Sequence, residues 1–231
     1  NNKFNWGILG TARICNSIIP VIRELGCEVH AVASRSEKKA INFCKKYNIK
    51  KYYTDYYSLI KDKEIQIVYI PLPNSLHYKW ILKAIEKNKH VLCEKPIVIS
   101  KEEINYIICK ANKAKIIITE ALMYRHHPIT LKTKNLIDNN IIGSIKKIDG
   151  NFHYKIIKDP NNIRYDASLA GGSLWDLGYY VVSFTNFILG CAPHKVRGFI
   201  IKEKNGVDME FQGKIMYPNN ILAEIKCSFN D

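Results

Sequence analysis

The chain has 231 residues, 47% of them hydrophobic and 24% charged, a balance typical of a globular protein with room for one or two cores. Its net charge is +14, but the 35 basic residues are spread along the chain and form no basic arm. This spread disfavours nucleic-acid binding as the main role and leaves only nonspecific attraction to polyanions. No apolar stretch approaches the roughly 20 residues of a membrane-spanning helix and no signal-peptide pattern is present, so we expect no membrane partner.

Up to about residue 120, short apolar strands alternate with helical segments. The strands are expected at 4–9, 29–34, 67–71, 90–93 and 115–119, and the helices at 13–25, 37–47, 76–88 and 101–113. The strands are rich in Val and Ile with little polar alternation, as buried parallel strands are. Repeated strand–helix units therefore predict an α/β fold over residues 1–122, a Rossmann-type doubly wound parallel sheet.

After about residue 128 the pattern changes to that of an α+β domain over residues 123–231. We expect a helix at 129–139, a strand at 145–157, a helix at 173–189 and strands at 195–203, 207–217 and 221–229. Short turns between the last three strands predict a mostly antiparallel sheet. The chain stops directly after the last strand, which leaves an edge unpaired. We expect this domain to be incomplete at its C-terminus, or its edge to be covered by another chain.

Seven cysteines are widely scattered and form no C-x-x-C pair, which suggests neither a disulfide framework nor a zinc site. They are interpreted as free thiols, and free thiols predict a reducing, cytoplasmic location. His126 and His127 are adjacent, so they point in different directions on a regular element, and no carboxylate or cysteine stands at ligand spacing. We therefore expect no metal site.

The first expected strand leads into "GTARIC", a poor version of the dinucleotide-binding pattern G-x-G-x-x-G. Gly10 is in frame, whereas Ala12 and Cys15 stand where the other glycines belong. Gly10 would supply the sharp bend, Ala12 the close approach to a pyrophosphate, and the helix opening near Arg13 its free N–H groups. Alone, the pattern fits an ordinary strand–turn–helix equally well.

The second expected strand ends in "ASRS", where a unit that prefers NAD usually has Asp or Glu. Ser34, Arg35 and Ser36 offer hydroxyl groups and a guanidinium instead. A guanidinium forms paired, charge-assisted hydrogen bonds with a phosphate, so this position favours the 2′-phosphate of NADP. NAD remains the alternative cofactor, and a solvated helix start is the alternative interpretation of the residues.

Glu94, Lys95 and Pro96 follow the strand "HVLC". They stand at the carboxyl end of a buried strand, where ligands bind in open α/β sheets. A cis peptide bond at Pro96 would aim Lys95 inward, and the sequence leaves cis and trans open.

Five segments, spread over nearly the whole chain, match one family when taken together. They are "WGILGTARI", "ASRS", "VYIPLPNSLHYKWILKAIEKNKHVLCEKP", "EALMYRHHP" and "GGSLWDLGYYVVSF". The chain resembles the Gfo/Idh/MocA oxidoreductases, the family grouped around glucose–fructose oxidoreductase and inositol dehydrogenase. The "ASRS" and "DLGYY" variants look most like the branch of dihydrodiol dehydrogenase and NADP-dependent xylose dehydrogenase.

The resemblance implies roles for particular residues. Lys95, Asp176 and Tyr180 match the catalytic positions, and Asp176 and Tyr180 share a helix face because they are four residues apart. Residues expected to line the substrate pocket are Tyr124, Arg125 and Trp175. Residues expected to bind the cofactor are Gly10, Thr11, Ala12, Arg13, Ile14, Ser34, Arg35, Leu72, Pro73, Asn74, His77, Glu94 and Lys95. The family also implies a homodimer or higher homo-oligomer formed through the C-terminal sheet.

The expected chemistry is hydride transfer between a nicotinamide and a hydroxyl of a sugar, polyol or related cyclic diol. A free tyrosine, with a pKa near ~10, is a poor base at neutral pH. A neighbouring ammonium such as that of Lys95 stabilises the phenolate, which would make Tyr180 a usable acid/base. The alternatives are an NAD-dependent glycosidase of the same family and a non-catalytic, nucleotide-binding or decayed homologue.

Overall fold

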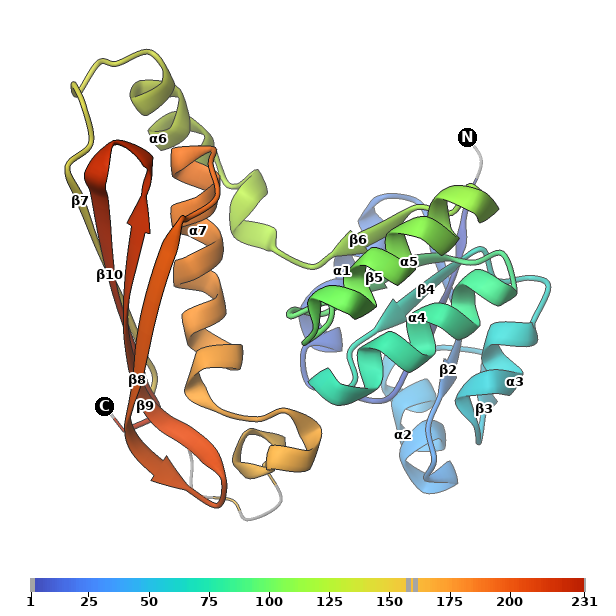
Figure 1. Ribbon diagram of the computed structural model, residues 1–231. Helices are drawn as coiled ribbons and strands as arrows, with labels where there is room; N and C mark the ends of the chain where they lie inside the picture. The colour runs from blue at the N-terminus through green and yellow to red at the C-terminus, as the bar shows by residue number, and fades with distance from the viewer. Residues whose placement is uncertain (1–2, 157–158, 160–161, 231) are drawn as a thin grey trace. The chain divides into compact units, whose positions relative to one another are not determined.

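The computed structural model describes residues 3–156, 159 and 162–230 (Figure 1). By its internal contacts the chain divides into two compact units, the first ending at Ala121 and the second beginning at Leu122. The fold class expected from the sequence is confirmed, because the first unit holds a parallel sheet and the second a mixed, mostly antiparallel one.

The first unit is a doubly wound α/β domain. Its six-stranded sheet has the order β3-β2-β1-β4-β5-β6, and the five pairs of neighbouring strands are parallel. This is the Rossmann strand order. The strands are β1 (Asn5–Leu9), β2 (Glu28–Ala33), β3 (Lys51–Tyr53), β4 (Ile67–Ile70), β5 (His90–Cys93) and β6 (Ile118–Glu120). The helices are α1 (Cys15–Glu24), α2 (Glu37–Tyr47), α3 (Tyr56–Lys61), α4 (His77–Glu86) and α5 (Lys101–Ala114).

Helices cover both faces of this sheet (Figure 1). Leu9 belongs to an apolar cluster that includes Ile81 of α4 and Ile107 of α5. Its neighbour Ile8 belongs to a second cluster, which includes Ile19 of α1. Successive strand residues point to opposite faces, so β1 contributes to both cores. Burial on both faces explains why the strands consist of apolar runs without polar alternation.

In this unit the sequence analysis missed one segment and misplaced the bounds of one strand and one helix. The segment holding β3 and α3 was not predicted, because an edge strand of Lys and Tyr lacks the apolar run of the central strands. The sixth strand was expected at 115–119, but Lys115 ends α5 in the left-handed conformation, with φ 57°, and the strand starts at Ile118. The first helix begins at Cys15 and not at residue 13.

The second unit is built on a four-stranded sheet with the order β7-β10-β9-β8. Strand β9 is antiparallel to both β8 and β10, while β7 is parallel to β10. The strands are β7 (Lys147–His153), β8 (Lys195–Lys204), β9 (Val207–Tyr217) and β10 (Ile221–Ser228), and the helices are α6 (Pro128–Asp138) and α7 (Tyr179–Leu189). Strand β7 is shorter than the expected 145–157, and residue 157 lies outside the described residues.

Helix α7 packs along one face of this sheet (Figure 1). Val181, Val182 and Leu189 contact a buried cluster that includes Tyr217 of β9 and Ile225 of β10. The single helix expected at 173–189 is in fact two elements. One turn of π-helix, Leu174–Gly178, precedes the α-helix, which starts at Tyr179.

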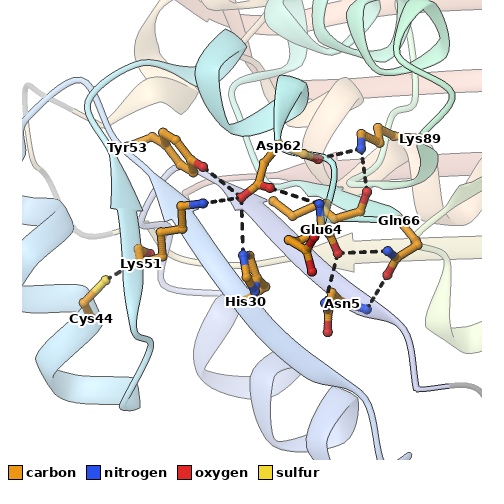
Figure 2. Close-up of polar contacts among 10 residues, drawn as sticks. Asn5, His30, Cys44, Lys51, Tyr53, Asp62, Glu64, Gln66 and Lys89 are labelled. Carbon is orange, nitrogen blue, oxygen red and sulfur yellow. Dashed lines mark hydrogen bonds and ion pairs between the residues drawn. The ribbon is translucent and has the colours of Figure 1, made fainter.

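A polar network around Asp62 holds the unpredicted segment of the first unit in place (Figure 2). Lys51 Nζ and the Tyr53 hydroxyl of β3 each donate to Asp62 Oδ2 at 2.8 Å. The Glu64 N–H donates to Oδ1 at 3.0 Å, and His30 Nε2 of β2 lies 3.3 Å from Oδ2. The carboxylate therefore joins the edge strand, its neighbour β2 and the loop after α3.

Burial of the Asp62 carboxylate raises its pKa, but the hydrogen bonds from Lys51, Glu64 and Tyr53 outweigh burial and hold the pKa well below its ordinary value. A depressed pKa means that the ionised carboxylate stabilises the folded state. This contribution is complete above about pH 4, the ordinary pKa of aspartate, and is lost as the pH falls below it.

Replacing Asp62 by Asn should lower the free energy of unfolding at pH 7 by about 2 kcal/mol, because charge-assisted bonds at a site whose side chain is 6% exposed are lost. The same variant should show a flatter pH dependence of stability below about pH 4. Urea unfolding between pH 2 and 8 measures both. The control is Asp138→Asn in the exposed Lys134–Asp138 pair, with an expected change below about 0.5 kcal/mol. Equal losses in the two variants would contradict the assignment.

Candidate functional site

The polar residues predicted in the first unit lie at the carboxyl edge of its sheet. The Gly10 turn follows β1, Ser34 and Arg35 follow β2, the 72–74 segment follows β4, and Glu94 and Lys95 follow β5. The carboxyl ends of parallel strands meet at one edge of a sheet, and ligands of open α/β sheets bind there. Each motif thus reaches this edge by way of a different buried strand.

The Gly10 turn requires a glycine. Its φ is +97°, in the region that favours glycine, and its N–H donates to the Ala33 carbonyl at 2.7 Å. A Cβ at this position would also lie 3.2 Å from Leu72 Cδ2. The chain can therefore bend sharply from β1 toward α1 while remaining tied to the end of β2.

Helix α1 begins without a side-chain cap. Ile14 occupies the cap position with no side-chain hydrogen bond, and no acidic residue stands in the first turn. The first N–H groups of a helix carry the positive end of its dipole. Thr11 and Ala12 are half-buried in the turn, whereas Arg13 is exposed. These residues fit a phosphate group, because the positive end of the helix dipole and the Arg13 side chain are present and no acidic residue stands in the first turn of the helix.

In the "ASRS" segment the two serines form local hydrogen bonds, and the arginine between them is exposed. The buried Ser34 accepts a hydrogen bond from the Ser36 N–H at 3.2 Å. Ser36 in turn caps α2 by accepting the Lys39 N–H at 3.4 Å. Each serine hydroxyl keeps its own hydrogen for donation. Arg35 lies exposed between them, so the guanidinium is accessible at the end of β2.

Glu94 receives a hydrogen bond from a tyrosine that the sequence analysis did not single out. The Tyr69 hydroxyl, on a fully buried side chain of β4, donates to Glu94 Oε1 at 2.6 Å. Burial, followed by the charge of Glu94, raises the pKa of Tyr69 well above its ordinary value, which keeps the hydroxyl as a donor. The same two causes raise the pKa of the Cys15 thiol to about 12. A tyrosine inside the aliphatic strand "IVYI" was the available sequence signal.

Lys95 precedes a cis peptide bond, which settles the open question at Pro96. His77 is completely buried beneath this turn, with Nδ1 2.8 Å from the Pro96 carbonyl oxygen and Nε2 2.7 Å from the Leu72 carbonyl oxygen. A neutral imidazole has a single N–H, so it donates to one of these two carbonyl oxygens, and its other nitrogen lies beside the second oxygen without a hydrogen between them. His77 thus lies between the segment after β4 and the turn after β5.

In the second unit, Trp175 and Asp176 lie on the π-helical turn and Tyr180 lies on the first turn of α7. Arg164, on the turn Ile163–Tyr165, donates from Nε to Asp176 Oδ2, an ion pair that the sequence analysis missed. The Tyr180 ring packs against Phe152 of β7, with centroids 5.7 Å apart. The predicted acidic and phenolic groups are thus each held by a neighbour distant in sequence.

Gly178 allows this turn to approach the sheet. A Cβ there would lie 2.9 Å from Leu174 Cδ1 and 3.0 Å from Cys227 Sγ of β10. The contact is tighter than side chains normally make, so a larger residue would displace the π-helical turn. The glycine of "DLGYY" consequently sets how closely Asp176 and Tyr180 are held to the sheet. Turns of π-helix occur frequently at functional sites.

Two residues predicted to line a substrate pocket are anchored to α7. The Tyr124 hydroxyl lies 2.7 Å from Ser183 Oγ, and Arg125 Nη2 donates to the same oxygen at 3.1 Å. The Tyr124 ring lies 6.3 Å from the Tyr180 ring and 5.8 Å from that of Phe184, measured between centroids. Ser183 is buried and was not predicted, because nothing in the sequence relates it to residues 59 positions away.

Within the described part of the chain, no group of three or more His, Cys, Asp or Glu residues could hold a metal ion. Among the same residues, none of the helices has the length and apolar character that a membrane crossing requires.

Comparison with known proteins places the chain in a family. Residues 4–122 match the model of an oxidoreductase family with an NAD-binding Rossmann fold, and residues 130–231 match the GFO/IDH/MocA C-terminal domain. The chain belongs to the Gfo/Idh/MocA oxidoreductase family. The resemblance expected from the five sequence segments is confirmed.

Named relatives in the Gfo/Idh/MocA family are dehydrogenases of sugars or diols. The chain is 35% identical to D-xylose 1-dehydrogenase (NADP(+)) 2 of Haloferax volcanii over 227 residues, which cover 97% of this chain and 69% of that protein. It is 32% identical to trans-1,2-dihydrobenzene-1,2-diol dehydrogenase of Xenopus laevis, with coverage of 90% and 66%. The chain thus spans about two-thirds of the length of these relatives.

Among solved structures, the chain is similar to KijD10 of Actinomadura kijaniata, a 3-ketoreductase solved in complex with NADP and TDP-benzene. The TM-score is 0.90 at 25% identity, and the match covers 100% of this chain and 71% of that one. These relatives are two dehydrogenases and a ketoreductase, which confirms the prediction that the chain belongs to a family of oxidoreductase enzymes.

Proposed function

We propose that this chain is an NADP-dependent oxidoreductase that transfers hydride between the nicotinamide and a hydroxyl of a sugar, polyol or related cyclic diol. The observation that carries the proposal is the position of Lys95, which follows β5 at the same sheet edge as the glycine turn after β1. The named activities of the xylose and dihydrodiol dehydrogenases support the substrate class.

The cofactor proposal assigns the pyrophosphate to the turn 10–14 and the 2′-phosphate to Ser34 and Arg35. Arg35 is exposed where an NAD-preferring unit carries a carboxylate, so the local charge favours an added phosphate. The nicotinamide and its ribose are assigned to the remaining predicted cofactor residues, Leu72, Pro73, Asn74, Glu94 and Lys95, with His77 supporting them. When bound, the nicotinamide supplies an acceptor or donor of hydride.

The catalytic proposal gives each remaining residue a role in moving a proton. In the oxidative direction, the phenolate form of Tyr180 would take the proton of the substrate hydroxyl as the C–O bond becomes a carbonyl, and the C–H hydride would leave to the bound nicotinamide. Lys95 stabilises the negative charge that develops on the oxygen. Asp176, held by Arg164, orients the substrate, while Tyr124, Arg125 and Trp175 line its pocket.

We also propose that the enzyme works in a reducing cytoplasm as a homodimer or higher homo-oligomer formed through the four-stranded sheet. The support is the free state of all seven cysteines and the edge strand β8, where Val196, Phe199 and Ile200 are 67%, 45% and 57% exposed.

Sedimentation velocity should give at least twice the chain mass, and Ile200→Lys should shift the distribution toward monomer. A wild-type chain that sediments only as a monomer would contradict the assembly.

The cofactor proposal predicts tighter binding of NADPH than of NADH, by at least about tenfold, because Arg35 forms charge-assisted hydrogen bonds only with the 2′-phosphate. Arg35→Ala should weaken NADPH at least about tenfold and change NADH by less than about twofold. Fluorescence titration at constant ionic strength measures the dissociation constants. The matched control, Arg197→Ala on the exposed strand β8, removes the same charge from the other unit. If both substitutions weakened NADPH binding equally, the loss would reflect nonspecific electrostatic attraction, and the assignment of Arg35 to the 2′-phosphate would be wrong.

The catalytic proposal predicts that Lys95→Ala or Tyr180→Phe lowers kcat at least about 100-fold, while the Kd of NADPH in the Tyr180→Phe variant stays within about threefold. The assay monitors NADPH at 340 nm with a panel of aldoses, polyols and cyclic diols. Tyr179→Phe removes a neighbouring hydroxyl from the same helix and should retain kcat within about threefold. Full turnover by both the Lys95 and the Tyr180 variant would overturn these roles.

A further inference from the structure

The peptide group between Pro96 and Ile97 is held at both of its polar atoms. Its carbonyl oxygen lies 2.8 Å from His77 Nδ1, at the start of α4. Its N–H donates to Glu120 Oε1 at 2.8 Å, at the end of β6. Lys95 lies one residue before this peptide group, so two elements distant in sequence meet at the turn that carries the proposed catalytic lysine.

His77 also contacts a second backbone segment of the first unit. Its side chain is fully buried, and Nε2 lies 2.7 Å from the Leu72 carbonyl oxygen. The ring therefore joins the turn after β5 to the segment after β4. Burial is the largest influence on the pKa of His77 and lowers it below its ordinary value. The two carbonyls and the charges of Glu94 and Glu120 act in the opposite direction but are outweighed. In such a buried position, a polar atom that loses its partner is left without water, which makes the contact costly to break.

We propose that His77 and Glu120 are positioning residues that fix Lys95 by clamping the Pro96–Ile97 peptide group. The proposal rests on the proposed function in one respect, namely that Lys95 is the group being positioned. In the proposed clamp, Glu120 accepts through a carboxylate and the Nδ1–H tautomer of His77 donates to the carbonyl of the same amide, so each contact polarises the group that the other binds. A peptide group held at both polar atoms resists rotation, and this restrains the backbone of Lys95, one residue before it. A displacement of about 1 Å at a catalytic group can cost about 100-fold in rate.

Two substitutions of His77 separate its contacts. The side-chain amide of asparagine reaches the place of Nδ1, so His77→Asn keeps a donor for the Pro96 carbonyl. The longer glutamine reaches the place of Nε2, so His77→Gln offers a donor to the Leu72 carbonyl and none to the Pro96 carbonyl. His77→Gln should lower kcat 10- to 100-fold with the Kd of NADPH within about threefold, and His77→Asn should retain kcat within about fivefold. A larger loss in His77→Asn than in His77→Gln would overturn the proposal.

The same logic applies at Glu120, which is only half-buried and tolerates substitution more readily than His77. Glu120→Gln keeps an acceptor oxygen for the Ile97 N–H, whereas Glu120→Ala removes it. We expect Glu120→Ala to lower kcat at least about tenfold and Glu120→Gln to lower it less than about threefold. Equal kcat in these two variants would contradict the clamp even if both His77 variants failed to fold.

Action through Lys95 is tested in a Lys95→Ala background. A positioning residue has nothing left to position there, so His77→Gln should add less than about twofold to the loss caused by Lys95→Ala, measured in single turnover. A merely structural effect would multiply the two losses. Full multiplication would therefore overturn the positioning role while leaving the proposed function intact.

One measurement needs neither cofactor nor turnover. In the full chain, the Ile97 amide should exchange slowly with deuterium, and Glu120→Ala should accelerate its exchange at least about tenfold while Glu120→Gln leaves it within about threefold. Unchanged exchange in Glu120→Ala would overturn the clamp. An inactive wild-type chain that nevertheless shows the expected exchange would instead count against the proposed function alone.

Discussion

Parallel pairing of the strands is the constraint on which the candidate site of the first unit depends. Strands β1, β2, β4 and β5 run in one direction, so their carboxyl ends form a common edge. Each strand returns to that edge through a helix, and burial on both faces fixes the register. Motifs separated by more than eighty residues in the sequence, such as those of Gly10 and Lys95, can then contribute to one site. Loss of this alignment would scatter the polar groups without altering any of them.

The sequence predicted those elements whose signal is local. Buried strands are apolar runs, and the segments that follow them carry glycine, serine or charged residues, so the strands and the carboxyl edge could both be located. The edge strand β3 could not be, because its polar residues are held by the Asp62 network and not by an apolar run. Helix α3 buries Leu59 and Ile60 but has only six residues, too few for a helical period to show in the sequence. A hydrogen bond between residues nine or more positions apart leaves no periodicity to detect.

The candidate site divides in the same way. Gly10, Arg35 and Lys95 were found because strand ends mark them, and Asp176 and Tyr180 because their motif does. Tyr69, Glu120, Arg164 and Ser183 were not found, because each is recognisable only by the partner that the fold provides. The expected helix at 173–189 contains a π-helical turn for a related reason. The spacing of its apolar residues is that of a helix, whereas the close approach of Gly178 to Cys227 is a property of the packed sheet.

The residues proposed to react and the residues that hold them obey opposite requirements. Lys95, Asp176 and Tyr180 are half-buried, since a reacting group must reach its substrate. An accessible side chain loses little free energy when it moves, because water replaces its contacts. Its position must therefore be set by buried groups, whose displacement costs more free energy. Tyr69, His77 and Ser183 are buried, and an unmade hydrogen bond there leaves a polar atom without water. The positions of the residues proposed to react are therefore set by buried polar groups that lie behind them and take no part in the chemistry themselves.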